Sequence, residues 1–201
     1  MTSTDVTTER FHLALVGAPN SGKTSLFNAL TGSRQKVANY AGVTVERKAG
    51  AFVTPAGRQV TLLDLPGTYS LRGRSPDEEI TRDVVLGKRP GEAAPDLVLC
   101  IADATNLRLT LRLILELKRT GRPLLVVLNM FDIAQRRGVS IDVDAMSAAL
   151  GVPVITSVAV KKAGVEELRK RTDEFAANMP AFTAGDGWKP LGLSEMKALQ
   201  R

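Results

Sequence analysis

Residues 17–24 read Gly17-Ala18-Pro19-Asn20-Ser21-Gly22-Lys23-Thr24, and they directly follow the apolar run 11–16. This GxxxxGK[ST] pattern is typical of a loop whose backbone N–H groups cradle phosphate oxygens. The lysine supplies a positive charge and the threonine hydroxyl a ligand for Mg²⁺. The stretch that starts at Ser25 has helical character, and the positive N-terminus of that helix faces the same anion. The sequence therefore predicts a strand, a nucleotide-binding loop and a helix, in that order.

Composition limits the classes of protein that the chain can represent. Its 201 residues suit one domain with a short appendage, and 44% hydrophobic residues with few aromatic ones suit an aliphatic core. Cys100, the only cysteine, lies in the apolar run 97–101, so we interpret it as a buried structural thiol and expect no internal disulfide. His12 is the only histidine and has no partner for metal or triad chemistry, so we interpret it as a strand residue.

Patterns that are missing from the sequence narrow the function further. No apolar run approaches the ~18 residues of a membrane span, and residues 1–10 lack the pattern of a signal peptide, so we expect a cytoplasmic location. The net charge is +6, but there is no long basic stripe with interleaved aromatic residues, so we expect no nucleic-acid partner. Basic clusters at 136–137, 161–162 and 169–171 are interpreted as a solvated face, with proximity to an anionic membrane surface as the alternative.

Apolar segments that alternate with amphipathic ones predict an α/β fold with a doubly wound sheet. A hairpin at Pro55-Ala56-Gly57 makes the second and third strands antiparallel, while buried, continuous apolar runs favour parallel strands elsewhere. The prediction is a six-stranded, mostly parallel sheet with one antiparallel edge pair and helices on both faces. We expect strands at 11–17, 49–54, 58–64, 97–103, 123–129 and 152–157, and helices at 22–31, 77–87, 106–120, 142–150 and 163–178.

One of these segments is ambiguous. Residues 107–113 alternate with a period of two, which taken alone indicates a strand. The run extends to Lys118, too long for a typical strand, and it lies between Asn106, a good N-cap, and Gly121-Arg122-Pro123, a good helix stop. We therefore predict a helix.

Two further segments suit the triphosphate end of a nucleotide. Asp64-Leu65-Pro66-Gly67 ends the third predicted strand, where the carboxylate can hold a Mg²⁺-bound water and the N–H of Gly67 can meet a γ-phosphate. Thr44 follows Gly42-Val43 between the first helix and the second strand, and its hydroxyl can complete the Mg²⁺ shell when a γ-phosphate is present. The sequence thus predicts a loop that orders with a triphosphate and relaxes on hydrolysis. The alternative for Thr44 is a plain threonine at the start of a strand.

The end of the fifth predicted strand indicates which base is bound. Asn129-Met130-Phe131-Asp132 places a carboxylate where it can accept from both N1–H and the exocyclic amine of guanine. Adenine presents an acceptor at N1 and would leave that carboxylate unpaired, which is costly. Asn129 is expected to tie the loops together. The segment Ser157-Val158-Ala159, at the end of the sixth strand, is expected to offer a backbone N–H to the base oxygen.

These five pieces, in this order, resemble the TRAFAC-class GTPases, and in finer detail the cytoplasmic G domain of the FeoB family of bacterial ferrous iron transport proteins. The resemblance rests on the stretches GAPNSGKTSLFNALTG (17–32), NYAGVTVERKAG (39–50), DLPGTYSL (64–71), ADATNL (102–107) and LNMFD (128–132). It implies a GTPase attached to a membrane iron permease, at the cytoplasmic face of the bacterial inner membrane. It also divides the chain into a flexible N-terminus (1–10), the G domain (11–178) and a linker or tail (179–201) that begins a truncated helical regulatory region.

The resemblance also implies a second ion. Asn20 matches the loop asparagine that in this family ligates K⁺, which stands in for an arginine finger. The backbone around Ala38 and Tyr40 matches the segment whose carbonyls complete the K⁺ shell. Thr68 occupies the position where Ras-like enzymes carry a water-orienting glutamine, so backbone groups of the segment near Thr44 are our candidates for orienting water. Residues 77–79 are the weaker alternative, since three acidic residues there also suit the first turn of a helix.

The sequence as a whole predicts a GTP hydrolase that uses Mg²⁺ and K⁺ and regulates or powers ferrous iron uptake. The residues expected to act in catalysis are Lys23, Asn20, Thr44 and Gly67. The expected Mg²⁺ ligands are Thr24, Thr44 and Asp64. Two alternatives stay open, a non-catalytic sensor of GTP and GDP and an RNA-linked GTPase, and so does association of the chain into a homo-oligomer.

Overall fold

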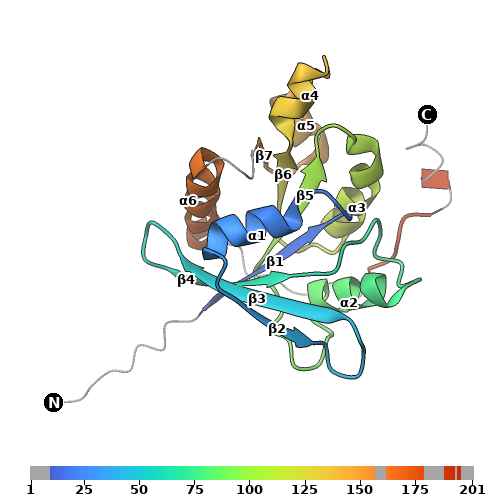
Figure 1. Ribbon diagram of the computed structural model, residues 1–201. Coiled ribbons are helices and arrows are strands. Elements are labelled where there is room, and N and C mark those ends of the chain that lie inside the picture. Colours follow the sequence, from blue (N-terminus) through green and yellow to red (C-terminus); the bar gives the residue numbers. More distant parts are fainter. Residues whose placement is uncertain (1–9, 157–161, 179–187, 193, 196–201) are drawn as a thin grey trace.

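The protein, for which we use a computed structural model, is described over residues 10–156, 162–178, 188–192, 194 and 195. Within this part of the chain a single mixed sheet has the strand order β2-β3-β4-β1-β5-β6-β7 (Figure 1). Strands β4, β1, β5, β6 and β7 run parallel to one another. Strand β3 is antiparallel to both of its neighbours, β2 and β4. Their bounds are β1 Phe11–Gly17, β2 Gln35–Asn39, β3 Glu46–Val53, β4 Gln59–Asp64, β5 Leu97–Asp103, β6 Leu124–Asn129 and β7 Val154–Thr156.

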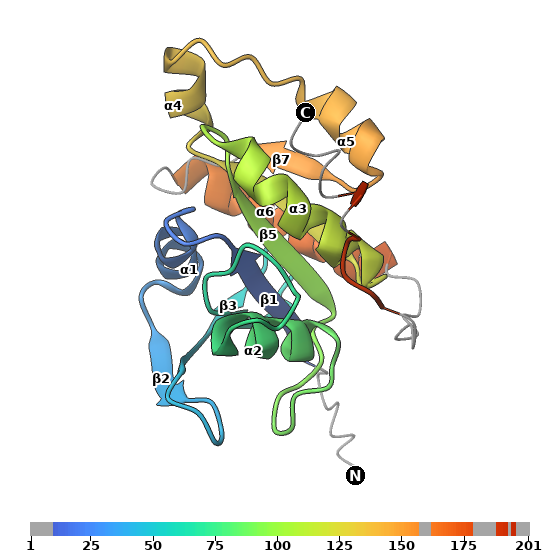
Figure 2. The same cartoon turned by 90° about the vertical axis from the view of Figure 1, so that its right-hand side faces the viewer.

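Helices cover both faces of the sheet, as the views in Figures 1 and 2 show. Side chains of α1 and α6 share one core with the sheet, and those of α2, α3 and α5 share the other. Alternate residues of β1 divide between these cores, since Leu13 and Leu15 face α1 while Ala14 and Val16 face α2 and α3. The helices are α1 Lys23–Thr31, α2 Pro76–Val85, α3 Leu107–Arg119, α4 Phe131–Arg136, α5 Val143–Leu150 and α6 Lys162–Asn178.

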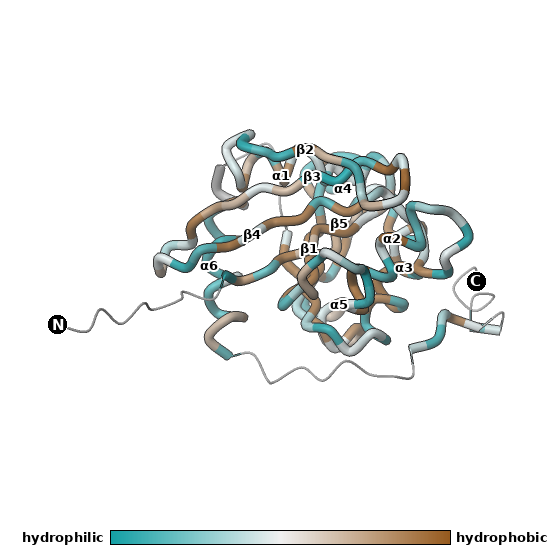
Figure 3. The backbone as a smooth tube through the Cα atoms, turned by 90° about the horizontal axis from the view of Figure 1, so that it is seen from below, coloured by the Kyte–Doolittle hydropathy of each residue, from teal (hydrophilic) through white to brown (hydrophobic). Residues whose placement is uncertain are grey.

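The central strands supply most of the buried apolar surface. Every residue of β6 is buried, and β5 is buried except at Asp103. The hydropathy colouring in Figure 3 shows the same contrast between hydrophobic central strands and the hydrophilic edge strand β2. Cys100 lies fully buried in β5, as expected, and burial raises the pKa of its thiol to about 12. None of the described helices is both long enough and apolar enough to span a membrane.

The predicted fold class is confirmed, but the strand count is wrong. The sheet has seven strands, and its antiparallel edge comprises β2, β3 and β4 instead of one pair. The strand that was missed, β2, is exposed at all five residues, so it carries no apolar alternation that a sequence pattern could detect. It exists because it pairs with β3, from Gln35 opposite Gly50 to Asn39 opposite Glu46.

The ambiguous segment is the helix α3, as predicted, and it ends in a turn at Thr120. A sixth helix, α4, was missed because it has only six residues and begins inside the Asn129–Asp132 motif. Helix α2 begins after Ser75, whose hydroxyl accepts a hydrogen bond from the backbone N–H of Glu78. Glu78 in turn accepts from the Ser70 hydroxyl at 2.6 Å and the Arg74 N–H at 2.9 Å, so this acidic residue caps its helix.

The described part of the C-terminal tail packs against α3 (Figure 2). The indole N–H of Trp188 donates to the backbone carbonyl of Glu116 at 3.1 Å, and Leu191 is only 4% exposed. Arg72 donates to the carbonyl of Leu191, and Arg119 pairs with Glu195. Residues 188–192 and Glu195 are therefore attached to the domain through both apolar burial and polar contacts.

Candidate nucleotide-binding site

The glycine-rich loop 17–24 connects β1 to α1 through a tight path that few residues can follow. Gly22 has φ 91° and Asn20 has φ 63°, both in the left-handed region, where glycine is favoured and asparagine tolerated. A Cβ added at Gly17 would lie 2.7 Å from the carbonyl oxygen of Ile101 in β5. The loop is thus pressed against the ends of the central strands, with the N-terminus of α1 directly behind it.

Lys23 and Asp64 form an ion pair at the base of the loop. The Lys23 Nζ lies 3.3 Å from Oδ1 of Asp64, and their side chains are 11% and 6% exposed. Burial raises the pKa of Asp64, and the positive charge of Lys23 opposes that shift. Oδ1 of Asp64 is buried and has no hydrogen-bond partner beyond this ammonium among the described residues, so it can accept a cation or a cation-bound water.

A cleft of about 380 Å³ brings together seven of the predicted site residues from three separate segments: Lys23, Thr24, Thr44, Asp64, Leu65, Pro66 and Gly67. The oxygens among them are hydroxyls and a carboxylate, which are the hard ligands that Mg²⁺ prefers. Sequence analysis missed Val45, Glu46 and Lys48 of this lining, whereas Asp77 belongs to the group 77–79 that it gave as the weaker candidate for orienting water. Lys48 and Glu46 pair with each other at 2.8 Å on alternate positions of β3, a contact that no motif predicts.

The segment that follows Asp64 is folded back onto the loop. The N–H of Thr68 donates to the carbonyl of Gly17 at 3.1 Å, and a Cβ at Gly67 would lie 3.2 Å from Pro19. The hydroxyl of Thr68 is buried and donates to the carbonyl of Ser70 at 2.7 Å. Thr68 therefore stabilises its own turn, and its hydroxyl is committed to the backbone.

The predicted base-binding end touches the loop directly. Nδ2 of Asn129 donates to the carbonyl of Ser21 at 2.9 Å, which confirms that Asn129 ties the two loops together. Met130 has φ 57° and is the N-cap of α4, which places Asp132 in the first turn of that helix. The carboxylate of Asp132 pairs with Arg136 at 3.2 Å, and surface pairs of this kind contribute little, so it remains available to a ligand. Ser157, Val158 and Ala159 lie outside the described residues.

The segment between α1 and β3 forms β2 and a tight turn over residues 40–45. The N–H of Tyr40 donates to the carbonyl of Val45 at 3.0 Å, and the N–H of Val43 donates to the carbonyl of Tyr40 at 3.2 Å. Ala38 lies in β2 opposite Arg47, and the side chain of Asn20 is exposed. Among the described residues, no hydrogen bond joins Asn20 to Ala38 or Tyr40. Gly42 lies at the tip of the turn with φ 79°.

A phosphate loop that leads from a strand into a helix, a cleft with Mg²⁺-type ligands and a loop-tying asparagine beside a base-binding aspartate together define a P-loop GTPase, a G domain. Comparison with known families identifies one family within that class. Residues 11–172 match the family FeoB_N, described as "Ferrous iron transport protein B". The chain belongs to this family and is a FeoB GTPase domain.

Individual relatives agree with this assignment. The chain is 49% identical over 174 residues to the Fe(2+) transporter FeoB of Escherichia coli K12, and to that of Salmonella typhimurium LT2, covering 85% of this chain and 22% of each transporter. It therefore spans about a fifth of the length of these relatives. Among solved structures, the G domain of T. maritima FeoB is 43% identical with a TM-score of 0.74, covering 83% of this chain and 99% of that one. The cytosolic domain of the same transporter, in its GMPPNP form, is 41% identical with a TM-score of 0.79, covering 88% of this chain and 68% of that one.

Proposed function

We propose that the GTPase reaction of this chain takes place in the cleft between the loop 17–24, Thr44 and the Asp64–Gly67 segment, by in-line attack of water on the γ-phosphate. The observation that supports the proposal is the convergence of Lys23, Thr24, Thr44, Asp64 and Gly67 on one cleft. Lys23 neutralises charge on the β- and γ-phosphates, and the N–H of Gly67 donates to the γ-phosphate. The N–H groups of residues 17–25 hold the remaining phosphate oxygens.

Thr24, Thr44 and Asp64 are the residues that would hold Mg²⁺. The donor chemistry fits, because two hydroxyls and a buried carboxylate with an unsatisfied oxygen line the same cleft. Mg²⁺ held by these residues would neutralise charge on the β- and γ-phosphates. Thr24 lies in the first turn of α1 and Asp64 at the buried end of β4, whereas Thr44 lies in an exposed turn outside any helix or strand, so Thr44 is the ligand whose contact depends on the γ-phosphate.

Guanine is selected by Asp132, whose carboxylate accepts from the two donors that guanine alone presents. Asn129 supports this end by holding the loop at Ser21, and Met130 provides the turn that aims Asp132. The segment Ser157–Ala159 is proposed to donate a backbone N–H to the base oxygen. GDP and GMPPNP forms of the T. maritima cytosolic domain are known, in keeping with a site for guanine nucleotides.

Potassium is proposed as the second ion. Asn20 carries a neutral amide oxygen in the loop, and the carbonyl of Tyr40 keeps one free lone pair after accepting from Val43. K⁺, when bound between these groups and the carbonyl of Ala38, offsets charge near the β–γ bridge. The buried, committed hydroxyl of Thr68 supports this proposal, because it leaves no glutamine-like side chain at that position.

The setting of the domain is also a proposal. We infer that the chain is the N-terminal part of a larger transporter, in which it regulates or powers ferrous iron uptake by an attached permease at the cytoplasmic face of the bacterial inner membrane. Its 22% share of the E. coli transporter supports attachment to a larger protein, and solved relatives are described as cytosolic domains. The division of the chain at residues 10 and 178, with 11–178 as the G domain, is part of this proposal. No nucleic-acid partner is proposed, and self-association is a matter for direct measurement.

One experiment tests the core of this function. Single-turnover GTP hydrolysis is measured in matched KCl and NaCl, for the wild type, Asn20→Ala and the exposed control Asn178→Ala. We expect faster turnover in KCl, lost in Asn20→Ala and kept in Asn178→Ala. Equal rates in both salts would remove K⁺ from the proposal, and binding of GTP without any turnover would favour the non-catalytic sensor.

A calorimetric experiment tests the base. We expect Asp132→Ala to weaken GDP binding by about 2–4 kcal/mol and to reduce discrimination against ADP. The control is Asp144→Ala, which removes an exposed carboxylate from the first turn of the neighbouring helix α5. Equal wild-type affinities for GDP and ADP would contradict the assignment of Asp132.

A further inference from the structure

The loop between α2 and β5, residues 86–96, meets the turn 40–45 that carries Thr44. Figure 2 shows both loops at the same edge of the molecule, although they lie far apart in the sequence. Arg89 makes the contact with two parts of its guanidinium. Its Nη2 donates to the carbonyl oxygen of Ala41 at 2.8 Å, and its Cζ lies 5.7 Å from the centre of the Tyr40 ring. One side chain thus holds both the backbone and the ring of adjacent residues in the turn.

A second contact from the same loop holds the other end of the turn. Glu92 accepts two hydrogen bonds from Arg47, from Nε to Oε1 at 2.5 Å and from Nη2 to Oε2 at 3.0 Å. Arg47 lies in β3 directly opposite Ala38 of β2, so this pair fixes the base of the β2–β3 hairpin. The pair is bidentate, and its side chains are only 29% and 11% exposed. Among ion pairs, this form contributes most to stability.

The Tyr40 ring completes this arrangement. It is 2% exposed and packs into the core shared by α2 and α3. Its hydroxyl is buried without a hydrogen-bond partner among the described residues, which makes this seat costly for a tyrosine. Burial, with the Glu92 carboxylate as the next contribution, raises the pKa of Tyr40, so the hydroxyl stays neutral. Apolar packing and Arg89 therefore hold the ring in the core, whereas the unpartnered hydroxyl makes this buried position less favourable.

Within the turn itself, Val43 and Val45 pack partly buried against the same core as Tyr40, and the other side chains face solvent. Ala41, Gly42 and Thr44 are exposed, and β2 is exposed along its whole length. Yet Thr44 lines the same cleft as Lys23, Thr24 and Asp64. An exposed turn keeps one position only if contacts outside it restrict its backbone. In this molecule the contacts from outside the turn are Arg89 and the Arg47–Glu92 pair, and they add to the packing of Tyr40, Val43 and Val45 against the core.

We infer that Arg89 and Glu92 are positioning residues for GTP hydrolysis, which hold the turn 40–45 so that Thr44 faces the cleft. The inference rests on the proposed role of Thr44 in the reaction. It assigns a function to the α2–β5 loop that no nucleotide-binding motif contains. Because neither residue lines the cleft, they act on the reaction only through the turn.

The test compares Arg89→Ala and Glu92→Ala with Lys88→Ala, a control that removes the neighbouring cation, whose side chain is exposed and makes no contact with the turn. Backbone amide exchange over residues 40–45 reports the position of the turn without nucleotide. Single-turnover hydrolysis and GDP affinity report its effect. For both variants we expect faster exchange and hydrolysis slowed roughly tenfold, because small misplacement of a reacting geometry is costly. GDP affinity should stay unchanged, and Lys88→Ala should behave as the wild type.

Two conservative variants separate positioning from simple loss of stability. Arg89→Lys keeps a donor for the Ala41 carbonyl and should recover part of the lost rate. Tyr40→Phe removes the unpartnered hydroxyl and keeps the ring, so exchange over 40–45 should be slower than in the wild type. A merely structural Arg89 would instead lower GDP affinity and hydrolysis together.

Several results would overturn the inference. Unchanged exchange over residues 40–45 in Arg89→Ala and Glu92→Ala would show that the loop does not hold the turn. Faster exchange with unchanged hydrolysis would show that the position of the turn does not matter to the reaction. Thr44→Ala, measured in parallel, tells whether the proposed function has failed as well, because in that case it too would leave hydrolysis unchanged.

Discussion

Two segments border the cleft, residues 35–46 and residues 65–75, and they are packed in different ways. Every residue of β2 is exposed, and the turn that follows is held mainly by contacts from Arg89 and from the Tyr40 ring. In the second segment Leu65, Thr68, Ser70 and Leu71 are at most 3% exposed. Apart from its buried anchor Tyr40, the first segment can change conformation by breaking surface contacts, whereas the second can move only if several buried side chains move with it.

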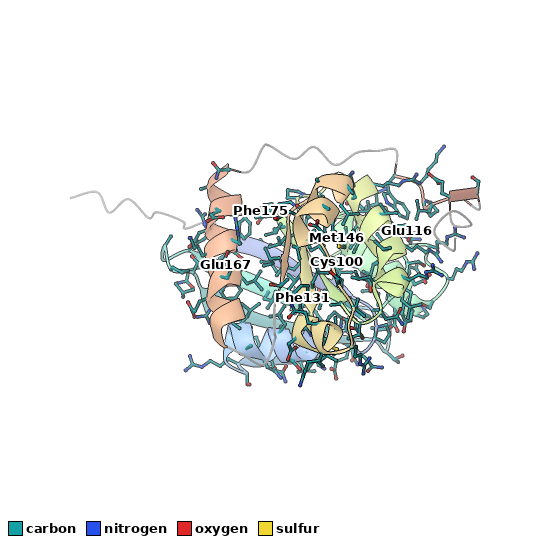
Figure 4. All side chains as sticks on the ribbon, turned by 90° about the horizontal axis from the view of Figure 1, so that it is seen from above. Cys100, Glu116, Phe131, Met146, Glu167 and Phe175 are labelled. Carbon is teal, nitrogen blue, oxygen red and sulfur yellow. The ribbon has the colours of Figure 1, made fainter. Side chains whose placement is uncertain are left out.

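The difference centres on Glu116 of α3. Its side chain is fully buried and accepts a hydrogen bond from the backbone N–H of Leu71 at 2.6 Å. Arg112 donates to it at 3.2 Å, and Nε of Arg72 lies 3.9 Å away. Figure 4, which labels Glu116, shows it on the side of α3 that faces the C-terminal segment, where Trp188 donates to its carbonyl. The second segment, α3 and residues 188–191 are thus linked through one residue.

The largest effect should follow from removing this carboxylate. Glu116→Ala leaves the Leu71 N–H and Arg112 without this acceptor and removes the buried negative charge beside Arg72, and we expect a loss of about 3–5 kcal/mol in the free energy of unfolding. Urea denaturation measures it. The control Glu174→Ala removes an exposed partner of Arg171 and should cost less than about 0.5 kcal/mol. If Glu116→Ala cost no more than the control, the buried link between the second segment and α3 would be unimportant.

The next effect concerns the exposed segment and appears in the reaction instead of in stability. Thr44→Ala should slow hydrolysis by about 100-fold, which corresponds to about 2.7 kcal/mol in the activation barrier. GDP affinity and the free energy of unfolding should hardly change, because Thr44 is exposed and is expected to meet Mg²⁺ only with a γ-phosphate. A large loss of GDP affinity would show that the two segments are more alike than their burial indicates.

A smaller effect is expected for the turn of the second segment. Thr68→Val keeps the shape of the side chain but removes the donor to the Ser70 carbonyl and the acceptor for the Ser70 N–H. The free energy of unfolding should fall by about 1–3 kcal/mol, because buried backbone groups lose their partners. Thermal unfolding with and without GDP measures this. A variant as stable as the wild type would mean that water replaces the hydroxyl and that the turn is less closed than its burial implies.

The smallest effect should come from the edge strand. Val37 in β2 is 52% exposed, so Val37→Ala should change the free energy of unfolding by less than about 0.5 kcal/mol. Leu71→Ala, a fully buried counterpart in the second segment, should cost about 2–5 kcal/mol. The same urea titration serves both variants. Similar losses at the two positions would end the contrast drawn between the segments.

Much of this architecture could be predicted from the sequence because it is coded locally. The apolar runs of β1, β5 and β6 and the GAPNSGKT loop each carry their own pattern, and the Asn129–Ser21 contact follows from the order of strand ends. By contrast, β2 is specified by its partner strand, so its residues QKVAN hold no period.

The buried polar contacts could not be predicted from the sequence, for a different reason. Glu116 lies in the run LRLTLRLILELKR, where a charge normally marks a solvent face, and only the approach of Leu71 and Arg72 makes it a buried acceptor. The contacts of Arg89 and Glu92 join residues 45 to 48 positions apart in the chain. The ion ligands and the roles of Asp132 and Asn20 stay predictions.

The close approach of Gly22 to Asn129 fixes the distance between the phosphate loop and the predicted base-binding end of the site. A Cβ at Gly22 would lie 2.0 Å from Nδ2 of Asn129, so the phosphate end and the base end of the site abut each other with no room for a side chain. The span from one end to the other is therefore set before any nucleotide arrives, and little backbone entropy is lost there on binding. Most of the backbone entropy that is lost on binding a triphosphate is therefore lost in the turn 40–45.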